Sequence, residues 1–228
     1  MCGRYTLTPE IGDLFQKLGL AGLPAELTPR YNIAPTQMVP ALLKGKSGEL
    51  EAGLFRWGLI PSWAKDISIG NRMINARGET VAEKPSFRSA FRKRRCLILS
   101  DGWYEWRKTP EGKQPVRIQL ESGDVFAFAG LWERWMPGEE QGGEVFSCAI
   151  ITSDICETLR GIHHRMPVVL KRDRWNAWLE SDASVESLQS MLLPYAGDDL
   201  SVYSVSTLVN SPMNDRQECI FPIDQTTE

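Results

Sequence analysis

The residue with the most distinctive chemistry stands at the second position, in the run Met1-Cys2-Gly3-Arg4. A small second residue generally permits loss of the initiator methionine, which would leave Cys2 with a free α-amine and a thiol on adjacent carbons. The amine can condense with an aldehyde to an imine, and the thiol can then close a thiazolidine ring. Unperturbed pKa values of about 8 for the amine and about 8.5 for the thiol leave both groups partly nucleophilic near neutral pH. Taken alone, a cysteine at this place is more often an ordinary residue of a frayed chain end.

A second group of interest is the carboxylate of Glu105, which alternates with aromatic residues in the segment 100–106. In a strand, Glu105 and Trp103 would share one face. Tyr104 and Trp106 would share the other. A carboxylate among aromatic rings is partly desolvated, which raises its pKa and suits it to proton transfer near neutrality. An exposed glutamate on a strand is the equally open alternative.

The two histidines of the chain, His163 and His164, are adjacent. Neighbouring side chains point apart in most backbones, so we expect at most one of them to face a given site. Without nearby cysteines or paired carboxylates they make a poor metal site, and we expect neither a metal nor another cofactor. Acid–base work beside Arg165 is the better use, with structural histidines as the alternative.

Two further regions could bind nucleic acid. In segment 74–80, Arg77 could hold a phosphate bidentately, although a surface ion pair is the commoner use of such residues. Proteins that bind single strands combine stacking aromatic rings with a basic groove. Trp57 and Trp63 could provide the stacking rings. We expect Trp57 in the core. The cationic run at 88–95 fits either a DNA groove or a solvated helix face.

Composition places the chain among soluble globular proteins, with 228 residues, 42% hydrophobic and 24% charged. The five cysteines include no Cys-x-x-Cys pair, which argues against a disulfide framework and a structural zinc site. The net charge of −3 hides an asymmetry, because residues 1–114 carry 18 Lys and Arg against 11 Asp and Glu. A basic half can bind phosphates. With neither a signal peptide nor a membrane-length apolar run, we expect a cytosolic or nuclear location and no membrane partner.

Strand patterns outnumber helical ones. The sequence predicts an α+β fold, with a curved, largely antiparallel, barrel-like sheet and short peripheral helices, in one domain of residues 1–228. Helices are expected at 8–18 with Thr8 as N-cap, and at 86–95, 173–180 and 184–193. Strands are expected at 38–43, 96–99, 116–120, 125–131, 145–151 and 202–205. Residues 121–124 are expected to join two of these strands as a tight hairpin.

Six segments in order resemble the SRAP family, named for SOS-response-associated peptidase. They are Met1-Cys2-Gly3-Arg4, Arg30-Tyr31-Asn32-Ile33-Ala34-Pro35, Trp57-Gly58-Leu59-Ile60-Pro61, Ile74-Asn75-Ala76-Arg77-Gly78-Glu79-Thr80, Asp101-Gly102-Trp103-Tyr104-Glu105-Trp106 and His163-His164-Arg165-Met166-Pro167. Each motif alone is weak, but six in register over nearly the whole chain are specific.

The resemblance implies a compact α+β domain that captures abasic sites in single-stranded DNA as a thiazolidine with the N-terminal cysteine. It implies roles for ten residues: Cys2 as nucleophile, Asn75 as a hydrogen-bonding group, Glu105 and His163 as proton carriers, Arg4, Arg77 and Arg165 as phosphate ligands, Asn32 and Thr152 as lesser contacts, and Trp63 as a stacking ring. We further expect a monomer, with replication or repair proteins as possible partners. Members of the family often carry Asp where His164 stands, and some have a second aromatic residue at Ala64.

Two alternatives remain open from the sequence. A thiol peptidase could use Cys2 with His163 and either Glu105 or Asn75, and its one action could be removal of its own Met1. A non-catalytic reader of modified DNA would bind without forming an adduct. Covalent capture of abasic sites is preferred over both alternatives, because a terminal Cys-Gly serves no purpose in a non-catalytic reader.

Overall fold

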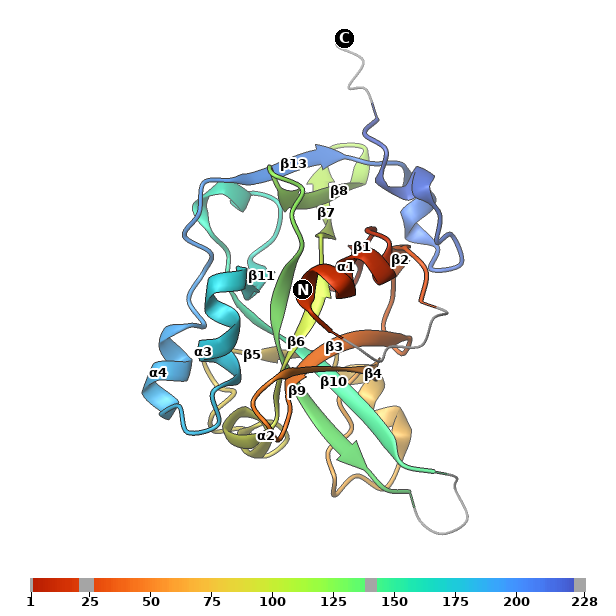
Figure 1. Ribbon diagram of the computed structural model, residues 1–228. Helices are drawn as coiled ribbons and strands as arrows, with labels where there is room; N and C mark the ends of the chain where they lie inside the picture. The colour runs from red at the N-terminus through yellow and green to blue at the C-terminus, as the bar shows by residue number, and fades with distance from the viewer. Residues whose placement is uncertain (1, 21–26, 138–142, 224–228) are drawn as a thin grey trace.

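The computed structural model describes residues 2–20, 27–137 and 143–223, which form two sheets with short helices outside them (Figure 1). The first sheet has the strand order β13-β8-β7-β1-β2, and all its pairings are antiparallel. Its strands are β1 (Tyr5–Leu7), β2 (Arg30–Ile33), β7 (Gly102–Thr109), β8 (Gly112–Leu120) and β13 (Leu200–Ser204).

The second sheet closes on itself. Its path runs β10-β4-β3-β6-β9, and β9 pairs β10 again, so that five strands form a barrel. The ring strands are β3 (Met38–Lys44), β4 (Leu50–Trp57), β6 (Arg95–Ser100), β9 (Phe126–Trp135) and β10 (Val145–Asp154). The short strands β5 (Asn75–Arg77), β11 (Arg165–Pro167) and β12 (Val169–Leu170) pair at its margins. The expected barrel-like, largely antiparallel sheet is confirmed, with parallel pairing only where β10 meets β4 and β5 among the described strands.

Helices are short and peripheral, as the sequence predicted. They are α1 (Ile11–Leu18), α2 (Arg88–Lys93), α3 (Trp175–Leu179) and α4 (Val185–Ser190), with 3-10 turns η1 (Ile67–Arg72), η2 (Glu157–Leu159), η3 (Arg172–Arg174), η4 (Thr207–Asn210) and η5 (Gln217–Ile220). The Ser184 hydroxyl caps α4 by accepting from the Ser187 N–H at 3.1 Å. No helix within the described ranges has the length and apolar character needed to span a membrane.

Two local predictions were wrong. Thr8 is not the N-cap of α1, which Glu10 precedes; the Thr8 hydroxyl donates instead to Asp101. Residues 121–124 do not form a hairpin, because β8 and β9 lie in different sheets. Strands β7 and β13 already pair with the two edges of β8. The chain therefore turns at Gly123 (φ 71°) and crosses to the barrel.

The five-stranded sheet packs on the barrel through aromatic side chains. Tyr5 of β1 contacts Trp57 of β4 and Phe128 of β9 edge-on, with ring centroids 5.2 and 5.6 Å apart. All three side chains are fully buried, which confirms the core position expected for Trp57. The Tyr5 side chain is therefore packed between the two sheets.

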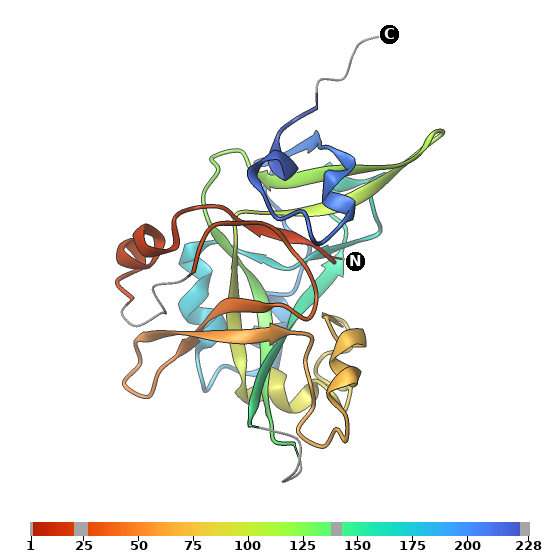
Figure 2. The ribbon, with the colours of Figure 1, turned by 90° about the vertical axis from the view of Figure 1, so that its right-hand side faces the viewer.

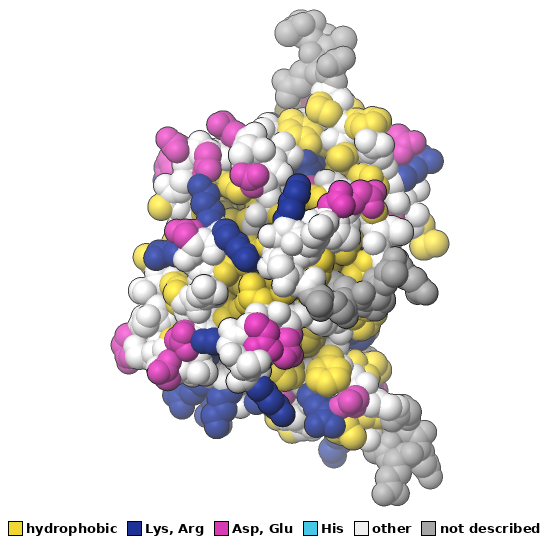
Figure 3. All heavy atoms as spheres, in the orientation of Figure 1, with side chains coloured by type: hydrophobic (Ala, Val, Ile, Leu, Met, Phe, Trp, Pro, Cys, Tyr) yellow, Lys and Arg dark blue, Asp and Glu magenta, His cyan; other side chains and the backbone are white. Residues whose placement is uncertain are grey.

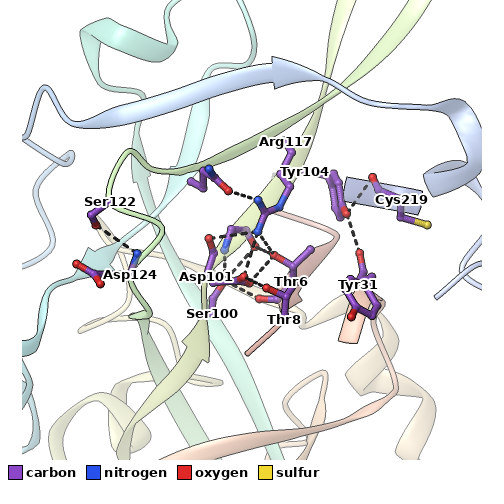
Figure 4. A network of polar contacts seen from close by, with 12 residues as sticks. Thr6, Thr8, Tyr31, Ser100, Asp101, Tyr104, Arg117, Ser122, Asp124 and Cys219 are labelled. Atoms are coloured by element: carbon purple, nitrogen blue, oxygen red, sulfur yellow. Dashed lines mark hydrogen bonds and ion pairs between the residues drawn. The ribbon is translucent and has the colours of Figure 1, made fainter. Parts of the chain in front are cut away.

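A buried polar network fixes β1 to its neighbours (Figure 4). Asp101 and Arg117 form an ion pair at 3.1 Å, and both side chains are almost inaccessible to solvent. The Thr6 hydroxyl donates to Asp101 at 2.7 Å and accepts from Arg117 at 3.0 Å. Gly102 permits this approach, since a Cβ there would lie 3.0 Å from the Arg117 guanidinium. The network holds β1 in register with β7.

Candidate active site

The antiparallel pairing of β1 with β7 brings the chain start to Glu105. Tyr5 pairs with Trp103, and the Tyr104 N–H donates to the Arg4 carbonyl at 3.0 Å. Residues before Tyr5 therefore run alongside those after Trp103. Two motifs about 100 positions apart in the sequence meet for this reason.

Cys2 is fully buried at this junction. Burial raises the pKa of its thiol well above the ordinary value, and the nearby Glu105 carboxylate raises it further. The thiol is therefore neutral at physiological pH until a base takes its proton. Met1, whose removal is expected from the sequence, lies outside the described residues.

Asn75 reaches Cys2 from the barrel. It begins β5, which pairs in parallel with β10, and its Nδ2 donates to the Cys2 carbonyl at 2.9 Å. Its Oδ1 is buried and has no hydrogen-bond partner among the described residues. A buried amide oxygen without a donor is costly to the fold, and it is ready to accept from a bound group.

Glu105 carries the perturbed carboxylate that the aromatic pattern predicted. Its side chain is 3% exposed, and desolvation raises its pKa to about 7. Trp103 belongs to the main core while Tyr104 packs with Val205 and Val209 on the opposite side, which confirms the two-faced strand. Near neutral pH this carboxyl group is populated in both its acid and its base form.

His163 lies in the loop before β11 and is half-buried. Its Nδ1 accepts the Arg165 backbone N–H at 3.0 Å, and its ring stacks on that of His164 with centroids 4.2 Å apart. Desolvation lowers the pKa of His163 to about 4, with His164 contributing in the same direction. The imidazole is therefore neutral at physiological pH, and its Nδ1 bond assigns the proton to Nε2.

Glu105 and His163 line one open groove of about 550 Å³. The rest of its wall comes from the β7–β8 hairpin and the loop 161–164, namely Trp106, Lys108, Lys113, Gly161, Ile162 and His164. The four residues predicted for catalysis therefore lie together. Asn75 donates to Cys2, Cys2 lies near the Glu105 carboxylate, and Glu105 lines the same groove as His163.

Two residues predicted to bind DNA, Arg77 and Trp63, are exposed to solvent. Arg77 is exposed and stands two residues after Asn75 on β5, so both side chains share one face of the strand. Trp63 is 59% exposed, in a loop anchored by the bond from Trp135 Nε1 to the Ala64 carbonyl at 2.7 Å. An exposed indole ring presents a flat face on which a nucleotide base can stack.

Arg165 and Thr152 are engaged inside the protein. Arg165 is 7% exposed, and its guanidinium donates to both carboxylate oxygens of Glu79, at 2.7 and 2.9 Å. It also donates to Asp154 at 2.7 Å and to the Thr152 carbonyl at 2.7 Å. Thr152 is itself buried. Phosphate binding by Arg165 stays a prediction, but this arrangement favours a role in fixing the loop that carries His163.

Asn32 and Arg4 form a similar internal pair. Asn32 is fully buried, and its amide donates to the carbonyls of Ser211 and Asn214 at 3.0 and 2.8 Å. Its Oδ1 accepts from Arg4 at 2.9 Å. Asn32 thus orients the half-buried Arg4, and direct contact of Asn32 with DNA stays a prediction that this geometry does not favour.

The family model described as SOS response associated peptidase (SRAP) matches residues 1–212. The chain belongs to the SRAP family. Over 224 residues this SRAP protein is 45% identical to the abasic site processing protein YoqW of Bacillus subtilis (strain 168), a match that covers 96% of this chain and 99% of YoqW. It is 34% identical to the abasic site processing protein HMCES of Gallus gallus over 227 residues, covering 86% of this chain and 67% of HMCES.

The fold of this SRAP protein also matches solved structures. A crystal structure of a protein from Bacteroides thetaiotaomicron superposes with a TM-score of 0.87 at 27% identity, covering 97% of this chain and all of that one. A second, from Bordetella bronchiseptica, gives a TM-score of 0.73 at 25% identity, over 90% of this chain and all of the other.

The residues that support the SRAP site were not predicted from the sequence. Glu79 and Asp154 hold Arg165, and the Asp101–Arg117 pair holds β1. The sequence suggested a surface ion pair as the commoner use of the residues in segment 74–80, whereas Glu79 pairs with Arg165 from outside that segment. The cationic run at 88–95 is divided between the protein interior and the surface. Arg95 is buried and donates to backbone carbonyls, while Arg88, Arg92 and Lys93 are exposed on α2. Figure 3 shows cations gathered at the lower end of the molecule, where α2 lies in Figure 1.

Proposed function

We propose that this SRAP protein captures abasic sites in single-stranded DNA by forming a thiazolidine between Cys2 and the ring-opened deoxyribose. The observation that carries the proposal is the burial of Cys2 beside Glu105 and Asn75, next to the groove that His163 lines. The abasic site processing relatives YoqW and HMCES support the same substrate.

The reaction begins once Met1 has been removed, by a separate aminopeptidase or by the protein itself. The neutral α-amine of Cys2 adds to the aldehyde carbon and forms a carbinolamine. Glu105, with a pKa of about 7, donates a proton to the departing hydroxyl, so that water leaves and an imine forms. The thiol sulfur then adds to the imine carbon while its proton passes through Glu105 to the nitrogen. One water is lost in total, and neither oxidant nor reductant is needed.

Closing the ring protects the DNA. An imine alone acidifies the neighbouring carbon of the sugar and leads to β-elimination, which cuts the strand. Addition of the Cys2 sulfur removes the C=N bond and with it the route to cleavage. Asn75 supports this step by fixing the Cys2 carbonyl at 2.9 Å, and its buried Oδ1 accepts a hydroxyl of the opened sugar.

His163 acts as a neutral hydrogen-bond donor. Its Nδ1 is occupied by the Arg165 N–H, so Nε2–H is the group that faces a ligand in the groove. We assign it to the sugar oxygen, where it promotes opening to the aldehyde and, in the reverse direction, release of the crosslink.

The test is a denaturing gel of the protein with a single-stranded oligonucleotide that contains one abasic site. Wild type should give a heat-stable adduct and uncut DNA. Cys2→Ser, which keeps the amine but has a weaker nucleophile, should give no stable adduct and more cut strand. Cys156→Ala is the matched control, because it removes another buried thiol that lies outside the groove. A stable adduct with Cys2→Ser would overturn the proposal.

A thiol peptidase acting in trans has less support. Such enzymes need a thiolate paired with an imidazolium, whereas burial here raises the pKa of Cys2 and desolvation lowers that of His163. Incubation with unrelated peptides should therefore give no turnover.

A further inference from the structure

We propose that the outer part of the β7–β8 hairpin is a second DNA-binding element, in which Lys108 and Lys113 hold backbone phosphates of the strand as it leaves the crosslink site. The inference rests on the proposed function, and it assigns the path of the DNA beyond the lesion.

The outer part of this hairpin is a two-stranded ribbon that projects from the body of the molecule (Figure 2). Strand β13 pairs with β8 only from Val116 to Leu120. Just beyond that point the Val205 N–H donates to the Pro115 carbonyl at 3.0 Å, and Gln114 Nε2 donates to the Val205 carbonyl at 2.9 Å. From the Lys108–Lys113 pair outward, the two strands pair with each other alone among the described strands. Isolated two-stranded ribbons are marginal in water, so this segment adds reach rather than stability to the fold.

The ribbon carries two lysines in direct opposition. Lys108 and Lys113 are cross-strand partners, and both are exposed. Like charges directly opposite each other destabilise a sheet, and neither lysine forms an ion pair with a carboxylate in the described part of the chain. Arg107 adds a third cation to residues 106–115, against one anion, Glu111. An external anion between the lysines relieves their repulsion.

The two lysines are continuous with the candidate active site. They line the same groove as Glu105 and His163. Along β7, the step from Glu105 to Lys108 is ~10 Å. Because the two residues are three positions apart, Lys108 leaves the strand on the face of Trp106 and borders the groove from that side. The ammonium groups therefore lie beyond the sugar that reaches Cys2, within range of a phosphate further along the strand. His164, exposed and stacked on His163, also lines this groove.

The test measures reversible binding of single strands that carry a tetrahydrofuran abasic analogue, which cannot open to an aldehyde. One probe has nucleotides only 5′ of the analogue and the other only 3′ of it. The variant is Lys108→Glu/Lys113→Glu. The control, Lys17→Glu/Lys46→Glu, makes the same change of net charge at exposed lysines outside the groove. Lys108→Gln/Lys113→Gln serves as the milder variant, and thermal unfolding checks that each protein is folded.

The charge reversal should weaken binding of one probe by about tenfold or more and leave the other within about twofold. The Gln variant should lower the salt dependence of the affected probe by about 1.4 in slope, since each single-strand phosphate contact contributes about 0.7. Equal affinities for variant and control with both probes would overturn the proposal, as would equal losses on both sides. Crosslinking of a genuine abasic strand by wild type, run in parallel, separates this outcome from failure of the proposed function.

Discussion

The Arg165 backbone N–H donates to Nδ1 of His163 at 3.0 Å, and this bond determines how the imidazole can act. Protonation of Nδ1 would replace the acceptor with a donor and break the bond. His163 therefore meets the groove as a neutral ring with a proton on Nε2. Arg165 is in turn held by ion pairs with Glu79 and Asp154, and these contacts fix the loop that carries His163.

His163 should stay neutral through the physiological range. An NMR titration of its ring should give a midpoint near 4, because desolvation opposes the imidazolium. As a donor rather than a base, it should be partly replaceable by an amide, so His163→Gln should form the crosslink faster than His163→Ala. The expected loss in the Ala variant is about 10²-fold or more in rate. A midpoint near the ordinary histidine value would contradict the assigned role.

Glu105 should destabilise the protein when it ionises. Its pKa is 4.5 in an unperturbed chain and about 7 in the fold, so the folded state binds more protons between these values. Stability should therefore fall as pH rises from 4.5 to 7, and Glu105→Gln should escape this fall. Urea unfolding should show the Gln variant gaining about 3 kcal/mol on wild type across that window. A difference that does not change with pH would show that the carboxyl group is not desolvated.

Glu79→Gln should change the pH dependence of stability in the opposite direction to Glu105→Gln. Hydrogen bonds from Arg165 lower the pKa of Glu79, so its ionised form stabilises the fold above the ordinary glutamate pKa. The variant should be less stable than wild type at neutral pH. Unfolding curves of the two should converge as pH falls through the lowered pKa. Because Arg165 holds the His163 loop, crosslinking should also slow in Glu79→Gln.

Trp63 should contribute to DNA binding but not to folding. Its ring is 59% exposed, so Trp63→Ala should change thermal stability little. Loss of one stacked base should cost about 1–3 kcal/mol of affinity for single-stranded DNA. Fluorescence anisotropy with the tetrahydrofuran strand measures this, and Met136→Ala, which truncates a side chain of equal exposure, is the control. Unchanged binding by Trp63→Ala would remove the indole from the DNA path.

Much of the fold could be read from alternating and helical patterns. The Trp175, Trp178 and Leu179 face of α3 and the Ser184 cap follow from residues a few positions apart. The 121–124 hairpin was wrong because strand pairing is a long-range property. A turn sequence does not reveal that β7 and β13 already occupy both edges of β8. The Thr8 cap failed for a related reason, since its hydroxyl is captured by Asp101 from 93 residues away.

The chemistry of the site was more predictable than its supports. Cys2 and Glu105 could be identified by residue type and local pattern, and the family motifs named Asn75 and His163. Burial of Arg165 and Asn32 could not be foreseen, because a guanidinium or amide in a motif looks the same whether it faces a phosphate or a carbonyl. Only the contacts with Glu79 and Ser211 separate the two cases.

The most direct measurement is the intact mass of the protein before and after incubation with an abasic oligonucleotide, followed by mapping of the modified peptide. We expect a chain that has lost Met1, an adduct with the mass of protein plus oligonucleotide minus one water, and modification confined to Cys2. Retention of Met1 in an adduct-forming protein, or an adduct located at any other residue, would contradict it.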